Sequence, residues 1–313
     1  MKILKFDLPA IGDVEVSIVS HEVAEFTKRQ LFLYLVAEAQ TNDDTRKNSI
    51  IVKNKKLLEQ CKKFFGTQKK LGRAYCVQDN SVAFSGLKYI LENDRFIIKT
   101  PTDKKRKWYQ FKKKLNYAQC HIRFYNQILF PLFSLYTLFD GYYLVHGTAL
   151  RYKKQNIIIS GLDGVGKSSL ANLLSAKADA IYADNFILFN GKSVMPLNLA
   201  MRLDPKQNTN LRVLYRDNDL QEAIPNVAQT KTANIDKIVL LYIGDKLEIT
   251  RGTNNLTGLV LFSNNAPEIN AANNIIAPFL YNAIKHSGIQ KLPQGVQMLS
   301  CPLGMLDKAV EVL

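Results

Sequence analysis

The stretch of sequence that decides the fold of this chain is Ile157-Ile158-Ile159-Ser160-Gly161-Leu162-Asp163-Gly164-Val165-Gly166-Lys167-Ser168. Its second part matches the pattern Gly-x-x-x-x-Gly-Lys-Ser, in which glycines let backbone N–H groups converge on phosphate oxygens. The isoleucine run is typical of a buried strand, and apolar residues follow the glycines at helical spacing, at Leu170, Ala171, Leu173 and Leu174. The stretch therefore predicts a strand, a phosphate-binding loop and a helix, in that order.

The loop also predicts the chemistry of its ligand. The N-terminus of the helix favours negative charge, the ammonium group of Lys167 would neutralise the β- and γ-phosphates, and the hydroxyl of Ser168 would ligate Mg²⁺. We therefore expect ATP with Mg²⁺. The residues expected to bind it are Gly161, Leu162, Asp163, Gly164, Val165, Gly166, Lys167, Ser168 and Ser169. A glycine-rich turn that binds nothing is the alternative, and the flanking strand and helix argue against it.

An acidic residue follows the helix. Residues 180–189 predict a further strand, and Asp184 lies in it where phosphate-loop proteins place a carboxylate that directs a metal or a water molecule. We expect Asp184 to bind Mg²⁺ together with Ser168. Asp204 is a weaker candidate ligand and Arg251 is a candidate cation for transition-state charge, although solvent exposure is the simpler expectation for both.

The strand before the loop has an expected partner that contains a histidine. Residues 142–152 form an apolar segment around His146-Gly147, and Lys153-Lys154-Gln155 predicts a turn that returns the chain to the isoleucine strand. A lone histidine in an apolar strand is more often structural than catalytic. Its position one hairpin away from the loop nevertheless makes His146 a candidate catalytic residue.

These features together resemble the catalytic domain of the HPr serine kinase/phosphorylase family, which includes kinases that modify peptide precursors. The family places a His-Gly strand, a hairpin, a GxxGxGKS loop and an Ala-Asp-Asp strand in this order, and residues 144–188 follow that pattern. The resemblance is weaker through residues 236–284, where an expected strand pair, 237–242 with 246–250, precedes a helical region. It implies a carboxykinase-like domain with a mixed sheet and transfer of the γ-phosphoryl group of ATP to a hydroxyl, usually of serine. It also implies that His146 lies near the transferred phosphate.

One position departs from the family pattern. Asn185 stands where the family has its second aspartate, which is taken to be the general base. An amide cannot accept the proton of a hydroxyl at neutral pH, but a general base contributes only about 10²–10⁴-fold. Positioning and charge neutralisation supply most of the acceleration in phosphoryl transfer. The sequence thus leaves open a slower kinase, a base relocated to Asp184 or His146, and an ATP-binding regulator without turnover.

Two other functions are compatible with the loop. Gly161-Leu162-Asp163-Gly164 also resembles thymidylate-kinase-type loops, in which case Arg202, Arg212 and Arg216 would form a lid that grips phosphate. Those enzymes usually open with the loop, whereas about 140 residues precede it here. The other alternative is a non-catalytic nucleotide-binding regulatory protein, whose basic first half would bind its partner.

Outside this region the sequence carries no recognisable chemistry. A chain of 313 residues, 47% of them hydrophobic, suffices for two modest domains. In the first part, Ser20 suits the N-cap of an expected helix that continues to Gln40, and residues 88–99 predict a hairpin. We therefore expect a smaller α+β domain over residues 1–115 and an α/β domain that contains the loop over residues 116–313.

Charge and apolar patterning narrow the expected partners and location. The net charge is +15, and residues 1–147 contribute most of it, with 25 Lys and Arg against 14 Asp and Glu, so an acidic partner would suit this half. The N-terminus lacks a signal-peptide pattern, and the most apolar stretch, residues 126–139, is too short to span a bilayer. The four cysteines form no Cys-x-x-Cys pair. We expect a cytoplasmic protein that binds ATP and a hydroxyl-bearing peptide, protein or small-molecule substrate.

Overall fold

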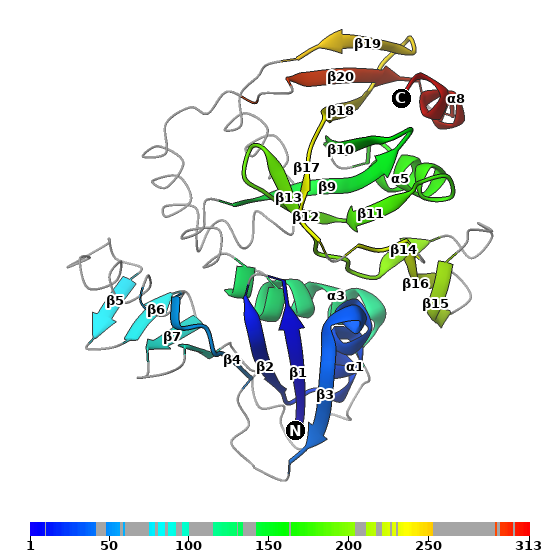
Figure 1. Ribbon diagram of the computed structural model, residues 1–313. Helices are drawn as coiled ribbons and strands as arrows, with labels where there is room; N and C mark the ends of the chain where they lie inside the picture. The colour runs from blue at the N-terminus through cyan, green and yellow to red at the C-terminus, as the bar shows by residue number, and fades with distance from the viewer. Residues whose placement is uncertain are drawn as a thin grey trace. The chain divides into compact units, whose positions relative to one another are not determined.

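The computed structural model describes most of the chain, and its contacts divide it into two compact units (Figure 1). The described residues are 1–9, 11–41, 48–56, 59, 75–78, 81–84, 87–91, 96–99, 115–129, 131–133, 142–162, 164–203, 211–216, 221–225, 227–229, 231–252, 292, 295–302 and 304–313. Those up to residue 133 belong to the first unit and those from residue 142 onward to the second.

The first unit is built on an antiparallel sheet. Its described strands number eight and follow the order β3-β1-β2-β4-β8-β7-β6-β5. They are β1 (Lys2–Leu8), β2 (Gly12–Ile18), β3 (Leu35–Gln40), β4 (Ser49–Val52), β5 (Tyr75–Gln78), β6 (Ser81–Phe84), β7 (Leu87–Leu91) and β8 (Phe96–Lys99). The described helical segments include α1 (His21–Gln30), a 3₁₀ turn (Phe32–Tyr34), α3 (Tyr117–Phe124) and a π-helical turn (Tyr125–Leu129). The pairing of β7 with β8 confirms the hairpin expected over residues 88–99.

Helix α1 begins where the sequence predicts and ends earlier. The side chain of Ser20 accepts a hydrogen bond from the N–H of Val23, and the helix stops at Gln30. The expectation of a helix to Gln40 is therefore wrong beyond this point, because Leu35–Gln40 pairs as β3 with the edge of β1. Pairing with a neighbouring strand outweighs the local helical period in this apolar segment.

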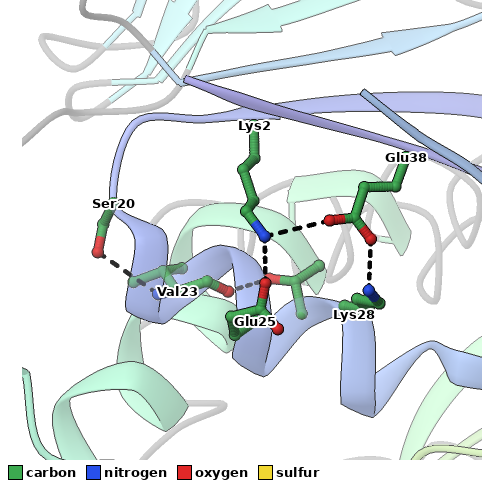
Figure 2. Close-up of polar contacts among 7 residues, drawn as sticks. Lys2, Ser20, Val23, Glu25, Lys28 and Glu38 are labelled. Atoms are coloured by element: carbon green, nitrogen blue, oxygen red, sulfur yellow. Dashed lines mark hydrogen bonds and ion pairs between the residues drawn. The ribbon is translucent and has the colours of Figure 1, made fainter. Parts of the chain in front are cut away.

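Ion pairs connect α1 with β1 and β3 (Figure 2). Lys2 of β1 binds the carboxylate of Glu25 in α1 and that of Glu38 in β3, the latter at 3.1 Å between nitrogen and oxygen. Lys28, about one turn beyond Glu25, binds the other carboxylate oxygen of Glu38. The four side chains alternate in charge and join the helix to two strands.

Helix α3 packs within the first unit. Its N-terminus has a capping box, in which the side chains of Asn116 and Gln119 each accept the other's backbone N–H. Its aromatic rings contact Phe26 of α1, with centroid distances of 5.2 Å for Tyr117 and 5.6 Å for Phe124. The division by contacts therefore differs from the boundary expected at residue 116, since α3 buries its aromatic side chains against α1.

The second unit contains a larger mixed sheet. Nine described strands form it, eight in the order β17-β13-β12-β9-β10-β18-β20-β19 and β11 paired with β9. They are β9 (Tyr143–Tyr152), β10 (Gln155–Gly161), β11 (Ala180–Ala183), β12 (Phe186–Phe189), β13 (Ser193–Met195), β17 (Ala233–Asn234), β18 (Lys237–Ile243), β19 (Glu248–Arg251) and β20 (Val296–Cys301). Strand β18 runs parallel to β10 and β20, whereas β9 is antiparallel to its neighbours. The expected α/β class with a mixed sheet is confirmed.

The described part of the unit also contains a smaller sheet and the helices α5 (Lys167–Ser175) and α8 (Leu306–Val312). The described strands β14 (Met201–Leu203), β15 (Leu211–Arg216) and β16 (Gln221–Pro225) form a three-stranded antiparallel sheet. The described helices α5 and α8 pack against each other. Within the described ranges, no helix combines the length and apolar composition that crossing a membrane requires.

Strand β10 is anchored in the core on both of its faces. Ile158 packs with Val145 and Ile238 on one face, and Ile157 and Ile159 pack with α5 and α8 on the other. All three isoleucines are fully buried, and burying such a side chain stabilises the fold by about 1.5–3 kcal/mol. The apolar run therefore fixes the position from which the glycine-rich loop starts.

Two expected strand arrangements are corrected by the structure. Residues 180–189 form two strands, β11 and β12, which are separated by Asp184 and Asn185. Residues 237–242 and 246–250 do not pair with each other, because β20 lies between β18 and β19. A strand from a distant part of the chain occupies that place, which a local pattern cannot indicate.

Candidate active site

The loop follows β10 in a conformation that its glycines allow. Strand β10 ends at Gly161, and α5 begins at Lys167 with Gly166 as its N-cap. The φ angles of Gly161, Gly164 and Gly166 are 155°, 78° and 93°, in the region that other residues rarely adopt. Asp163 lies outside the described residues. The backbone thus turns from strand into helix through left-handed conformations, as the motif predicts.

Neighbouring elements approach the loop closely. A Cβ atom on Gly161 would lie 2.3 Å from the carbonyl oxygen of Leu241 in β18, and one on Gly166 would lie 2.9 Å from Cδ1 of Leu306 in α8. Val165 packs against the core that these elements share. The loop is therefore held between β18 and α8, at the end of two parallel strands where α/β proteins bind ligands.

Lys167 is buried at the base of the loop. Lys167 is only 7% exposed, and its Nζ donates a hydrogen bond to the carbonyl oxygen of Leu162 at 2.7 Å. Ser168 and Ser169 are exposed in the first turn of α5, where backbone N–H groups have no intrahelical acceptor. The first turn therefore offers an ammonium group, two hydroxyls and backbone N–H groups to an anion.

Asp184 and Asn185 form the turn between β11 and β12. Asn185 has a φ angle of 70°, and the N–H of Phe186 donates to the carbonyl oxygen of Asp184 at 2.9 Å. The carbonyl oxygen of Asn185 accepts a hydrogen bond from the N–H of Gly147 at 3.2 Å. Backbone contacts therefore attach the turn to β9.

The carboxyl group of Asp184 is held by a hydroxyl that sequence reasoning missed. The hydroxyl of Thr148 in β9 donates a hydrogen bond to Oδ1 of Asp184. Burial raises the pKa of the Asp184 carboxyl above its usual range, and the hydrogen bonds from Thr148 and from the backbone of Asn185 counter part of that rise. The available signal was a hydroxyl residue two positions after His146, on the same face of an apolar strand.

His146 lies on β9 beside this turn. Its ring stacks on Phe186 with a centroid distance of 5.6 Å and an interplanar angle of 23°, and its carbonyl oxygen accepts a hydrogen bond from Oγ of Ser160 at 2.6 Å. A Cβ atom on Gly147 would lie 2.2 Å from the carbonyl oxygen of Ile159, so β9 and β10 approach closely here. The stacking accounts for a structural role of His146, and its catalytic role stays a prediction.

Strand β9 relates the acid to the loop. It pairs with β10 on one side and with β11 and β12 on the other, and the register sets Thr148 opposite Ile159. On the other side, the pairs Ala183–Ala149 and Phe186–His146 place Asp184 opposite Thr148. Asp184 therefore lies level with Ile159, two residues before the end of β10. Two strand spacings separate their backbones, about 10 Å.

The other candidates lie on other elements or outside the described residues. Arg202 lies in β14, and Arg212 and Arg216 lie in β15 of the smaller sheet. Arg251 is exposed on the edge strand β19. It pairs with the beginning of β20, at the end of the parallel strands opposite to the loop. Asp204 lies outside the described residues.

The residues at the loop edge fit the chemistry of Mg²⁺-ATP. The first turn of α5 would supply donors for phosphate, and Ser168 and Asp184 would supply two oxygen ligands of the kind that Mg²⁺ prefers. Among the described residues, no three His, Cys, Asp or Glu side chains cluster as a metal site. Mg²⁺ that is bound with a nucleotide requires no such cluster, because phosphate oxygens and water complete its coordination.

Comparison with known proteins gives a distant structural relationship. In sequence, the chain matches no protein-family model and no curated protein. In structure, it is similar to the HPr(Ser) kinase/phosphatase from Coxiella burnetii, with 14% sequence identity and a TM-score of 0.28. The match covers 54% of this chain and 92% of that chain.

Proposed function

We propose that the second unit binds Mg²⁺-ATP and transfers the γ-phosphoryl group to a hydroxyl of a peptide, a protein or a small molecule, with a Ser or Thr side chain as the favoured acceptor. The observation that supports this proposal is the loop. Glycines at positive φ lead a buried strand into a helix whose first residue is a buried lysine. P-loop kinases and NTPases use this arrangement to hold β- and γ-phosphates.

Each residue at the end of β10 and in the turn between β11 and β12 has a role in this proposal. Lys167 exchanges the carbonyl oxygen of Leu162 for phosphate oxygens when the nucleotide binds. Ser168 and Asp184 hold Mg²⁺, which supplies charge neutralisation as the phosphoryl group leaves ADP. His146 lies beside the transferred group, and Asn185 orients the acceptor hydroxyl, whose proton passes to an oxygen of the transferred phosphoryl group as the new O–P bond forms and the bond to ADP breaks. Positioning then dominates catalysis, as a loose transition state permits.

A ligand-dependent thermal shift tests the nucleotide site. Mg²⁺-ATP at 100-fold above Kd adds about 2.7 kcal/mol to the stability of the unit that binds it. For a unit of this size, each kcal/mol of stabilisation raises the Tm by roughly 2–4 °C, so we expect a shift of several degrees. Lys167→Ala should remain folded without ligand and lose most of the shift. Lys177→Ala, which removes an exposed lysine just beyond the same helix, should keep it. An unchanged shift in Lys167→Ala would falsify the loop as the nucleotide site.

Product analysis then separates the possible activities. The purified chain is incubated with γ-labelled ATP, Mg²⁺ and an extract of its host. A labelled hydroxyl product supports the proposal, and a labelled nucleotide product supports a nucleotide kinase. Binding without conversion favours a nucleotide-binding regulator, which is the outcome that the amide of Asn185 makes worth testing.

A further inference from the structure

The side chain of Thr148 occupies a buried position between the acid and the strand that leads into the loop. Thr148 is 2% exposed. Its backbone pairs with Ile159 of β10, two residues before Gly161, and its hydroxyl donates to Oδ1 of Asp184 on the opposite side of β9. A β-branched side chain in a strand has few χ1 rotamers, so the direction of this hydroxyl is well fixed.

The ladder on this side of β9 is interrupted beside Thr148, at the turn between β11 and β12. β9 pairs with β11 up to Ala183 and with β12 from Phe186 onward. The two residues between these strands bind β9 in other ways: Asn185 through the N–H of Gly147, and Asp184 through its carboxylate and the hydroxyl of Thr148. At this point of the sheet, a side chain therefore replaces a backbone contact.

We propose that Thr148 is a positioning residue, whose hydroxyl holds the Asp184 carboxylate in the orientation that binds Mg²⁺ beside the loop. This role rests on the proposed function. Oδ1 receives a fixed donor, and the remaining lone pairs of the carboxylate serve the metal. Hydrogen bonds to a ligating carboxylate typically change metal affinity by about 10–100-fold when they are removed.

A matched pair of variants tests this role without measuring turnover. Thr148→Val keeps the branched shape and removes the hydroxyl, whereas Thr148→Ser keeps the hydroxyl. ATP binding to the full chain is titrated with Mg²⁺, using a fluorescent ATP analogue. We expect the Mg²⁺ concentration for half-maximal ATP binding to rise by about tenfold or more in Thr148→Val. In Thr148→Ser, we expect this concentration to stay within about twofold of wild type. Ser175→Ala, which removes a buried hydroxyl at the other end of α5, should match wild type.

A double-mutant cycle tests the contact itself. Thr148→Val, Asp184→Asn and their combination are compared by thermal unfolding without nucleotide. The change in Tm of the double variant should differ from the sum of the single changes, because the two residues interact directly. Additive changes, or equal Mg²⁺ requirements for Thr148→Val and wild type, would overturn the positioning role while leaving the nucleotide site intact. A wild-type chain that binds no Mg²⁺-ATP would overturn the proposed function and, with it, this role.

Discussion

At Asn185 the backbone has a φ angle of 70°, which asparagine and aspartate adopt far more readily than other non-glycine residues. Backbone hydrogen bonds fix the turn on both sides of this residue, through Phe186 and Gly147. The backbone conformation therefore suits an asparagine or an aspartate at this position.

This shared backbone preference makes Asn185→Asp an informative substitution. We expect it to keep the apo Tm and ATP binding, and to raise phosphoryl transfer, or ATP hydrolysis without substrate, by about tenfold or more. A positioned base supplies about 10²–10⁴-fold, and the expectation is lower because the neighbouring Asp184 raises the pKa of a second carboxyl unless Mg²⁺ is bound. Rates are measured with and without Mg²⁺, and the gain should require the metal.

Two other results for this variant would contradict a missing base. Normal binding without any gain in turnover would favour a regulator. A slower enzyme would show that the amide of Asn185 acts on the acceptor directly. Asn234→Asp adds the same charge on the exposed edge of β17 and should change neither ATP binding nor turnover.

At the scale of secondary-structure elements, ion pairs attach α1 to β1 and β3 (Figure 2). The hydrogen bond from Lys2 lowers the pKa of the Glu25 carboxyl, and the same bond raises the pKa of the Lys2 ammonium. The two directions agree. A lowered carboxyl pKa means that the stabilisation is present above about pH 4.5, the ordinary value, and is lost as the pH falls through the lowered pKa.

Glu25→Gln should therefore destabilise the first unit at neutral pH and have little effect in acid. The loss in unfolding free energy should be below about 1 kcal/mol, because the Glu25 side chain is partly exposed and water screens the pair. Urea unfolding of wild type and variant at pH 7 and pH 3 measures it. High salt at pH 7 should also shrink the difference. A difference that persists in acid would mean that packing of Glu25, rather than its charge, stabilises the helix.

Local signals in the sequence predicted some elements correctly and could not predict others. The isoleucine run, the glycines and the following apolar spacing define β10, the loop and α5 within one short stretch, so they could be predicted. The strand at Leu35–Gln40 could not, because its partner β1 lies at the start of the chain. The contact between Thr148 and Asp184 joins residues 36 positions apart, and it depends on a break in a strand that the apolar pattern of residues 180–189 conceals.

Across the whole molecule, backbone pairing separates the two units. Among the described strands, those of the first unit form one sheet and those of the second unit form others, with no strand shared. The loop, Lys167 and Asp184 all belong to the second unit. A ligand of the loop therefore acts on the stability of that unit, and chains with separate folding units often unfold in more than one step.

We accordingly expect calorimetry to resolve two unfolding transitions. Mg²⁺-ATP should raise the temperature of one by several degrees, by the linkage described for the loop, and should leave the other nearly unchanged. Glu25→Gln should lower the temperature of the first unit's transition at neutral pH and leave that of the second unit, the one that Mg²⁺-ATP shifts, unchanged. A single transition that moves with both perturbations would show that the units unfold as one cooperative body.

The glycines at 147 and 161 also bear on how relatives of this chain should be interpreted. Each faces a backbone carbonyl oxygen, of Ile159 and Leu241, so close that any side chain would collide with it. A main-chain oxygen cannot be removed by mutation, so only a shift of the backbone itself could relieve such a collision. Selection for folding alone would thus preserve both glycines whatever the chain binds. The side chains of Thr148 and Asp184 meet no such backbone collision, so under the proposed function their divergence is what would mark a lineage that no longer binds Mg²⁺.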